Sequence, residues 1–385
     1  MGIQGLTKLI ADVAPAAITE HDFDFYKGRK VAVDASMSMY QFLIAVRNSG
    51  MDLVSDTGEV TSHISGMFYR TIRLFEEGLR PMFVFDGRAP DLKREELNRR
   101  SEKQTDAVEA QEEAATVEDA IKAAKRTVRV SREQANDCRK LLTLMGVPII
   151  DAPSEAEAQC AALTRAGKVW ATGSEDMDTL TFGSPILLRH LTAAPSQKKL
   201  IMEIRLDKVL EGMALTMDQF IDLCILCGCD YTTTIKGIGP KKAYKLIQDH
   251  GSIEGALESL DKTKYEIPAD FRYVEARALF KTPDVHDPET IDMKWNDIDE
   301  DGLIQFMVGE NKFSEERVRS GIERLKKATR DKRVQVRMDS FFKPSEPSTS
   351  GVKRPGSGSG GPPLKKSNSP GRGGASAGRG RGRGK

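Results

Sequence analysis

Acidic residues that directly follow apolar runs or open helical segments constrain the fold of this chain more than any other feature. Seven such acids stand in five motifs: Asp34, Asp86, Glu155, Glu157, Asp176, Asp178 and Asp230. In an open α/β sheet, the carboxyl ends of parallel strands meet at one edge, and binding sites form there. Packing this many negative charges together is costly unless cations bind them. The sequence therefore predicts that the seven acids converge on a metal site.

An all-oxygen ligand set suits hard divalent ions such as Mg²⁺, and two such ions suit hydrolysis of a phosphodiester. The acids thus indicate a metal-dependent nuclease. Structural alternatives exist for single residues: Asp34 and Asp86 could end strands or cap helices, and the remaining acids could be ordinary loop or cap residues. Residues 154–157 also fit a capping box. On a regular helix Glu155 and Glu157 would lie about 200° apart, which predicts that one binds a metal directly and the other through water.

The alternation of apolar and helical patterns predicts an α/β fold with a mostly parallel central sheet flanked by helices. Short apolar runs typical of buried parallel strands lie at residues 31–33, 82–85, 147–150, 169–171 and 186–188. Helical spacing separates them, as at 62–77, where His63, Met67, Arg70 and Leu74 form one stripe. We expect an N-terminal nuclease region at 1–105, an internal nuclease region at 134–235 and a mainly helical DNA-binding region at 216–330.

Residues 91–133 differ from their surroundings because they are rich in charge and poor in large apolar side chains. A solvated helix with i,i+4 ion pairs would explain such a run. Because the segment closely follows Asp86, we favour a helical arch that lacks a full core of its own and orders around a substrate.

Charge and cysteine content indicate where the protein works. Residues 331–385 hold 13 Lys or Arg against three acids, a net charge of +10, so the remaining residues carry −9 of the total of +1. Bound cations would offset part of that negative charge. The five cysteines form an odd set in a chain without a secretory signal pattern and are expected to be reduced and intracellular. Residues 224–229 lack a second Cys/His pair at suitable spacing, which favours buried thiols over zinc.

Residues 237–243 (Gly-Ile-Gly-Pro-Lys-Lys-Ala) predict a DNA contact. Two glycines permit a tight turn, and Pro240 suits the first position of a helix whose bare N–H groups lie beside lysines. Such a hairpin grips a phosphate backbone without reading sequence. The alternative is an ordinary helical corner with a solvated lysine pair.

The C-terminal region contains two further signals. Residues 335–342 (Gln-Val-Arg-Met-Asp-Ser-Phe-Phe) either supply the last core aromatics or form a short linear motif that docks into a hydrophobic pocket. Beyond about residue 344 the chain is rich in Gly, Ser, Pro and Arg and is expected to be disordered. Its basic pairs at 353–354 and 365–366 resemble a bipartite nuclear import signal, and its Arg-Gly repeats offer nonspecific phosphate contacts. A purely solubilising tail is the alternative.

Together these motifs resemble the flap endonucleases of the structure-specific 5′-nuclease superfamily, over residues 1 to about 343. The matching stretches are 1–6, 33–36, 84–87, 152–158, 173–178, 229–231 and 237–242. Two departures stand out: the loop at 55–59 carries few acids, and the tail departs from a Lys-rich pattern.

The resemblance implies a catalytic site with two Mg²⁺ ions, for which Mn²⁺ could substitute. One ion would lie nearer Asp34, Asp86, Glu155 and Glu157, and the other nearer Asp176, Asp178 and Asp230. Lys93 and Arg100 would contact the scissile phosphate, and their spacing of two helical turns lets both face the site. Tyr40 would stack on the terminal base, which tolerates any sequence. Gly2 would lie near the active site.

The resemblance also implies further contacts. The residues that touch DNA would be Tyr40, Arg47, Arg70, Lys93, Arg100, Glu155, Gly228, Asp230, Gly237, Gly239, Lys241, Lys242, Lys312 and Phe313, the last two at a one-nucleotide 3′ flap. Backbone carbonyls would hold a K⁺ ion at Thr234, Ile235 and Ile238. A trimeric sliding clamp would bind Gln335, Met338, Phe341 and Phe342, with Met338 replacing the commoner Leu.

The function implied is a structure-specific 5′ flap endonuclease with 5′ exonuclease activity, acting in Okazaki-fragment maturation and long-patch base excision repair. The protein would be a monomer that joins the clamp in the nucleus, including the nucleolus, with a further pool in the mitochondrion. Two alternatives are a repair exonuclease or bubble nuclease of the same superfamily, and a noncatalytic scaffold that binds the clamp and nucleic acid.

Overall fold

The structure, a computed structural model, describes residues 2–48, 61–112, 130–193 and 199–330, without the side chains of 45–48, 104 and 107–112. Several predictions fall outside these residues. They concern the loop at 55–59, the part of the arch at 113–129, and the clamp motif and basic tail within 331–385.

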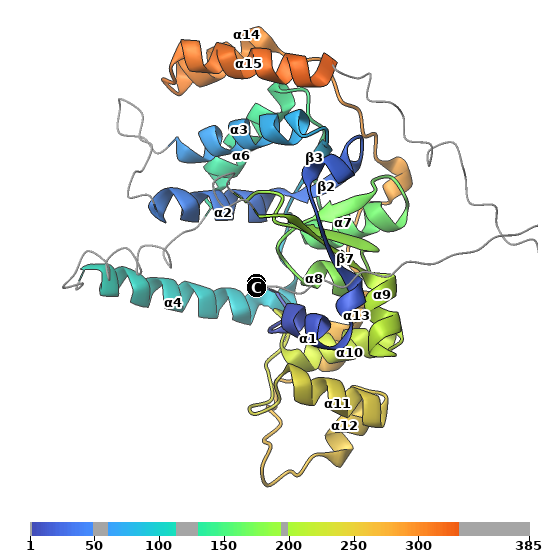
Figure 1. Cartoon of the computed structure of the whole chain (residues 1–385). Coiled ribbons are helices and arrows are strands. Elements are labelled where there is room, and N and C mark those ends of the chain that lie inside the picture. Colours follow the sequence, from blue (N-terminus) through green and yellow to red (C-terminus); the bar gives the residue numbers. More distant parts are fainter. Residues whose placement is uncertain (1, 49–60, 113–129, 194–198, 331–385) are drawn as a thin grey trace, which may run out of the picture. The chain divides into compact units, whose positions relative to one another are not determined.

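A seven-stranded sheet forms the centre of the fold (Figure 1). Its strands are β1 (Ile18–His21), β2 (Lys30–Asp34), β3 (Arg80–Phe85), β4 (Ile149–Asp151), β5 (Ala171–Gly173), β6 (Ile186–Arg189) and β7 (Ile201–Arg205). Their order is β1-β7-β6-β5-β2-β3-β4. The five neighbouring strands β6, β5, β2, β3 and β4 pair in parallel, whereas β7 pairs antiparallel with both β6 and β1. The mostly parallel sheet predicted from the sequence is confirmed.

The two strands that the sequence analysis missed form the antiparallel end of the sheet. β1 reads Ile-Thr-Glu-His and none of its residues is buried, so it lacks the apolar run of an interior strand. β7 buries Ile201, Glu203 and Ile204, and the buried acid interrupts the apolar pattern. The predicted strand at 169–171 is also displaced, since β5 begins only at Ala171.

Helices cover both sides of the sheet. The N-terminal half contains α1 (Leu6–Val13), η1 (Pro15–Ala17), η2 (Phe23–Tyr26), α2 (Ala35–Asn48), α3 (Ser62–Glu76), η3 (Asp91–Lys93), α4 (Arg94–Glu112), α6 (Arg132–Leu144), α7 (Ala156–Arg165) and α8 (Asp178–Thr181). The C-terminal half contains α9 (Leu206–Met213), α10 (Met217–Cys227), α11 (Pro240–His250), α12 (Ile253–Ser259), α13 (Tyr273–Lys281), η5 (Pro288–Thr290), α14 (Glu300–Ile304), the π-helical η6 (Gln305–Glu310) and α15 (Glu315–Arg330). Among the described helices, none has both the length and the apolar character needed to span a bilayer.

Two large hydrophobic clusters hold these layers together. One joins the sheet to α3, α6 and α15 through residues such as Phe68, Phe83 and Ile322. The other joins α1 to α10, α11 and α13 through residues such as Phe220 and Ile247. In Figure 1 these helix groups lie on opposite sides of the sheet.

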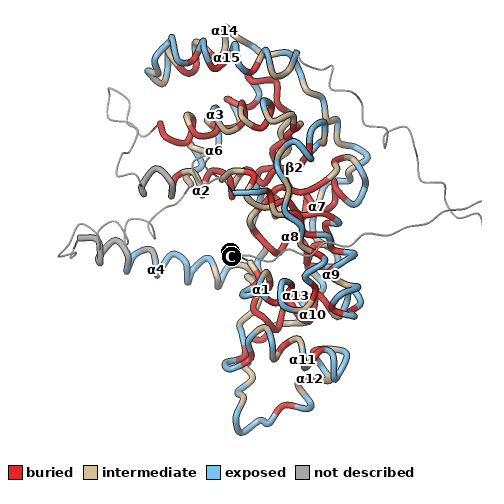
Figure 2. The backbone as a smooth tube through the Cα atoms, in the orientation of Figure 1, coloured by how far each residue is buried: buried red, intermediate tan, exposed pale blue. Residues whose placement is uncertain are grey.

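The helix α4 stands apart from this core. Figure 2 shows it projecting from the body, and its described residues from Arg94 to Lys103 are exposed except the half-buried Glu96. Its polar contacts include ion pairs, among them Arg272 with Glu95 at 3.0 Å. The first part of the segment 91–133 is thus a helix without a full core, as both the arch and the solvated-helix interpretations predict.

The region from α10 to α13 is locked by a buried ion pair. Asp222 of α10 is 4% exposed, accepts a hydrogen bond from the backbone N–H of Ile253 (3.1 Å), and takes two from the guanidinium of Arg277 in α13 (2.6 and 2.8 Å). The same guanidinium also binds Glu254 of α12. One cation therefore ties three helices together.

We expect Arg277→Met to destabilise the protein by roughly 2–4 kcal/mol, because it leaves the buried carboxylate of Asp222 without its counter-charge. Urea unfolding followed by circular dichroism measures the change. The matched control on the same helix is Lys281→Met, which removes only the exposed pair with Asp218 and is expected to cost less than about 1 kcal/mol. Equal losses for the two variants would contradict the assignment.

Candidate active site

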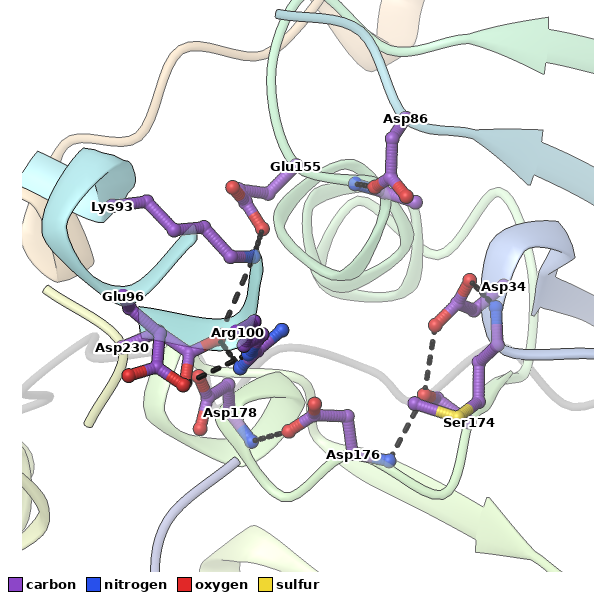
Figure 3. A network of polar contacts seen from close by, with 12 residues as sticks. Asp34, Asp86, Lys93, Glu96, Arg100, Glu155, Ser174, Asp176, Asp178 and Asp230 are labelled. Carbon is purple, nitrogen blue, oxygen red and sulfur yellow. Dashed lines mark hydrogen bonds and ion pairs between the residues drawn. The ribbon is translucent and has the colours of Figure 1, made fainter. Parts of the chain in front are cut away.

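The predicted acids meet at the carboxyl ends of the parallel strands. Asp34 is the last residue of β2, and Asp86 directly follows β3. Asp176 lies between β5 and α8, and Asp178 opens α8. Figure 3 shows these side chains around one space, with Glu155 from the start of α7 and Asp230 from the turn after α10. The predicted convergence is confirmed.

Three of the acids form a tight group. Oxygen atoms of Asp86, Glu155 and Glu157 all lie within 4.8 Å of one another. The capping-box alternative for 154–157 is wrong, because Glu155 rather than Ser154 occupies the N-cap position of α7. The side chain of Glu155 makes no capping hydrogen bond. Instead, Oδ1 of Asp86 accepts a hydrogen bond from the backbone N–H of Ala156 (2.8 Å). The acid after one strand thereby caps the helix that carries the other two acids.

The expected 200° separation of Glu155 and Glu157 is also wrong. Glu155 has extended backbone angles (φ −81°, ψ 131°), so helical spacing does not apply between it and Glu157. Because the chain turns at this residue, both side chains reach the same space.

A second chain of contacts holds the acids on the other side of the site. The hydroxyl of Ser174 donates to Oδ2 of Asp34 (3.1 Å) and accepts from the N–H of Asp176 (3.1 Å). Oδ1 of Asp176 accepts from the N–H of Asp178 (3.0 Å), and Oδ1 of Asp34 accepts from the N–H of Met37 (2.9 Å). These bonds fix the orientation of the carboxylates before any ligand arrives.

Lys93 and Arg100 reach the acids from the base of the arch. Nζ of Lys93 lies 2.5 Å from Glu155 and 3.6 Å from Asp230, and Nη2 of Arg100 lies 2.7 Å from Asp230. Burial lowers the pKa of Lys93, but the nearby carboxylates outweigh this effect and hold it above its ordinary value. Both predicted cations therefore face the site, although Lys93 ends η3 and only Arg100 lies on α4.

The acids are crowded enough to change their protonation. Burial, followed by the charge of Asp86, raises the pKa of Asp34 to about 8. Burial likewise raises the pKa of Glu157 and of Asp178 well above the ordinary values, with neighbouring carboxylates adding to the effect. Without a bound cation, these carboxyl groups therefore keep their protons to a higher pH than exposed acids do.

The site fits divalent cations. Within the described residues, Oε2 of Glu157 and Oδ1 of Asp178 are buried without any hydrogen-bond partner. Buried oxygens without partners are rare in folded proteins and call for an ion or water. The carboxylate group of Asp86, Glu155 and Glu157 supplies the hard ligands that Mg²⁺ and Mn²⁺ prefer.

An open cavity of about 1080 Å³ surrounds the site. Tyr40 of α2 and Gly228 after α10 line it together with five of the acids, Lys93 and Arg100. Gly2 lines it too, and a Cβ at this position would lie 1.8 Å from Oδ1 of Asp176. Gly2 therefore lies against the acids, as the resemblance implied.

The other predicted contact residues lie away from the acids. Gly237 has φ +81° and Gly239 is the N-cap of α11, whose first residue is Pro240, so the predicted turn and helix start are confirmed. Lys241 pairs with Asp12 (3.1 Å), and Nζ of Lys242 lies 3.4 Å from the ring centre of Tyr265.

The predicted K⁺ carbonyls lie in the same turn: Ile235 and Ile238 are buried, Thr234 is exposed, and the N–H of Ile238 donates to Ile235 O (3.2 Å). Lys312 and Phe313 lie after η6, where the Lys312 ammonium donates to Gly309 O (2.6 Å). Arg70 already donates to Ser38 O (3.0 Å). The side chain of Arg47 lies outside the described residues.

Sequence reasoning missed two polar residues that orient the site. Ser174 joins Asp34 to Asp176, and Glu96 pairs with Arg100 at 2.8 Å. Ser174 stands inside the acidic motif at 173–178, and Glu96 precedes Arg100 by four residues, a helical pairing distance. Both signals were present in the sequence.

Comparison with known proteins agrees with this geometry. The sequence matches the XPG N-terminal domain over residues 1–107 and the XPG I-region over residues 146–230. It is 56% identical to flap endonuclease 1 of Zea mays over 361 residues, covering 92% of this chain and 94% of the relative.

Solved structures give the same result. Flap endonuclease-1 from Methanococcus jannaschii superimposes with a TM-score of 0.67 at 34% identity, covering 86% of this chain and all of that one. The catalytic core of Rad2 in complex with DNA substrate gives a TM-score of 0.64 at 27% identity, covering 84% and 100%. Fold and acidic site together define a nuclease of the XPG type. Within that class, the chain belongs to the flap endonuclease 1 family.

We expect the metal-free protein to lose stability as the pH rises from about 4 to about 8. The folded protein keeps a proton on Asp34 up to a pKa of about 8, whereas the unfolded chain loses it near the ordinary aspartate pKa of 3.8. The stabilisation is complete below the lower pKa and disappears as the pH passes the higher one. Thermal unfolding in EDTA measures the slope. Asp34→Asn should flatten it, and an unchanged slope in this variant would contradict the assignment.

Proposed function

We propose that this protein cuts 5′ flaps from branched DNA in a reaction that requires divalent metal ions, with Mg²⁺ as the principal ion. The observation that carries the proposal is the convergence of seven carboxylates, Lys93 and Arg100 at the base of an exposed helix, beside an open cavity that five of the acids line. A scaffold protein has no use for so many crowded carboxylates, whose mutual repulsion is costly unless cations bind them. Membership of the flap endonuclease 1 family supports the choice of substrate.

In this proposal the seven acids hold the metal ions, which when bound supply activation of water and charge compensation at the leaving oxygen. Lys93 and Arg100 face the acids from the arch and contact the scissile phosphate, where they stabilise the negative charge that develops. Tyr40, on the wall of the cavity, stacks on the terminal base. The 5′ flap passes under the arch that begins with α4.

The DNA on either side of the junction binds outside the cavity. The N-terminus of α11, with Lys241 and Lys242 beside it, provides N–H groups and positive charge for the phosphate backbone of the duplex. A K⁺ ion held by the carbonyls of Thr234, Ile235 and Ile238 would add to that contact. Lys312 and Phe313 receive the one-nucleotide 3′ flap.

The reaction belongs to Okazaki-fragment maturation and long-patch base excision repair, which place the protein in the nucleus, with a second pool in the mitochondrion. Its protein partner is a trimeric sliding clamp. Gln335, Met338, Phe341 and Phe342 have the spacing of a motif that presents a polar anchor and hydrophobic side chains from one helical turn.

We expect Asp178→Asn and Asp86→Ala to abolish cleavage of a double-flap DNA with a one-nucleotide 3′ flap, while binding of the junction stays largely intact. Lys93→Ala should slow the cut by roughly a hundredfold or more, because a charge-stabilising group is lost. Rapid-quench assays with Mg²⁺, repeated in EDTA, measure the rates. The control is Asp91→Asn, an exposed acid in η3 that pairs with the neighbouring Arg88 and Arg94.

The products of the same assay separate the rival functions. A single Mg²⁺-dependent cut one nucleotide into the downstream duplex supports the flap endonuclease. Stepwise shortening from the 5′ end, or preference for a bubble of the same sequence, supports the exonuclease or bubble-nuclease alternative. Tight binding without any cut by the wild-type protein would favour the scaffold and contradict the proposal.

We expect Phe341→Ala combined with Phe342→Ala to abolish binding to the sliding clamp, because the two aromatic anchors of the motif are lost. Cleavage of flap DNA in the absence of the clamp should not change. Surface plasmon resonance on immobilised clamp measures the binding, with Ser340→Ala as the matched control. Undiminished clamp binding by the double variant would exclude this motif as the docking site.

A further inference from the structure

A segment without regular structure apart from η5 connects α13 to α14, and we call residues 282–299 the strap. It follows the outside of α7 and the adjoining strands. Ile291, Met293 and Trp295 of the strap pack against the cluster that α7 forms with β2 and β3. The indole N–H of Trp295 donates to the carbonyl of Pro81 in β3 (2.9 Å), and the N–H of Asn296 donates to Gly146 O (2.9 Å). The strap is therefore a fixed part of the fold.

One buried side chain joins the strap to α7. Gln159 is completely buried, and the oxygen and the nitrogen of its amide both form hydrogen bonds with one strap residue. Its Oε1 accepts from the backbone N–H of His286 (2.7 Å), and its Nε2 donates to the carbonyl of the same residue (3.2 Å). This reciprocal pair resembles one step of a β-ladder. Since only the backbone of His286 takes part, the contact fixes where the strap lies and not which side chain it carries.

Gln159 lies one turn beyond the acids in the same helix. Its own N–H donates to the carbonyl of Glu155 (3.2 Å), and Glu157 lies between the two in sequence. The start of α7 is fixed from the opposite side, where Asp86 caps Ala156 and the N–H of Gly87 donates to Ser154 O (2.7 Å). The first turn of α7 is thus held between the loop after β3 and the strap.

Packing alone does not call for glutamine at this place. A buried amide requires partners for both of its polar atoms, whereas an apolar side chain of the same length would fill the space without that demand. The amide does set the rotation and depth of α7 against the strap, and through them the positions of Glu155 and Glu157. Metal sites depend on such supporting contacts, because a displacement of the ligands by about 1 Å is enough to weaken them.

We propose that Gln159 is a positioning residue for the metal site. Its two hydrogen bonds to the backbone of the strap hold the first turn of α7 where Glu155 and Glu157 share a cation with Asp86. The inference rests on the proposed function, in which these three acids bind divalent ions. It assigns to the strap, far along the chain from the acids, a part in metal affinity.

The test measures Mn²⁺ binding by electron paramagnetic resonance on the full chain without DNA. Gln159→Met keeps the length and an apolar fit but loses both hydrogen bonds, and we expect its Mn²⁺ affinity to fall roughly tenfold. The side chain in Gln159→Asn is too short to reach both groups, so the Mn²⁺ affinity of this variant should also fall. It replaces the first variant if that one does not fold. Thermal unfolding of each variant in EDTA reports stability separately.

Two control variants leave the two hydrogen bonds between Gln159 and the backbone of His286 intact. His286→Ala removes only the contact of its ring with Asp151 O (3.2 Å) and keeps the backbone groups that Gln159 binds. Lys168→Ala removes the exposed pair with Glu289 of the strap (2.8 Å). Both should bind Mn²⁺ like the wild type.

The outcomes separate the inference from the proposed function. Wild-type Mn²⁺ affinity in a folded Gln159 variant, even with a lower unfolding midpoint, would reduce Gln159 to a structural role and overturn the inference. Failure of the wild-type protein to bind more Mn²⁺ than Asp86→Ala binds would instead overturn the metal site itself. Weakened binding in both Gln159 variants, with normal binding in both controls, would support the inference.

Discussion

Repulsion among carboxylates at one edge of the sheet is the constraint on which the rest of this structure depends. Burial in a common space raises the pKa values of Asp34, Glu157 and Asp178, and each remaining negative charge raises those of its neighbours. The fold relieves the repulsion in two ways that need no ligand. Backbone N–H groups and Ser174 donate to the carboxylates, and Lys93 and Arg100 pair with Glu155 and Asp230. Divalent cations would complete that relief.

The elements around the site are arranged to hold this charge in place. The parallel strands bring their carboxyl ends to one edge, and two helix-covered clusters fix that edge on either side. Asp86 shows how closely the parts are joined, because it is a candidate ligand that also caps the helix carrying Glu155 and Glu157. The strap adds support from behind through Gln159. By contrast, α4 is attached through its base and a few ion pairs.

Much of this arrangement could be predicted because the strongest signals are local. An apolar run followed by Asp marked β2 and β3, and Gly-Ile-Gly-Pro marked the start of α11. The failures came where a local pattern competed with a tertiary contact. Ser154 has the spacing of a helix cap, yet Asp86, which follows β3, caps α7 instead. Glu155 has extended backbone angles, although the surrounding sequence predicts a helix there. β1 was missed because pairing with β7, and not an apolar pattern of its own, makes it a strand.

The sequence by itself determined the chemistry: seven carboxylates, two cations and a helical hairpin, because residue types and their spacing decide what a site can bind. Only the tertiary structure decided which of these groups meet. It placed oxygen atoms of Asp86, Glu155 and Glu157 within 4.8 Å of one another. It also paired Lys93 with Glu155 and brought the backbone of His286 to Gln159. Such partners are separated by many residues, and their contacts depend on packing of the whole core, which no local pattern encodes.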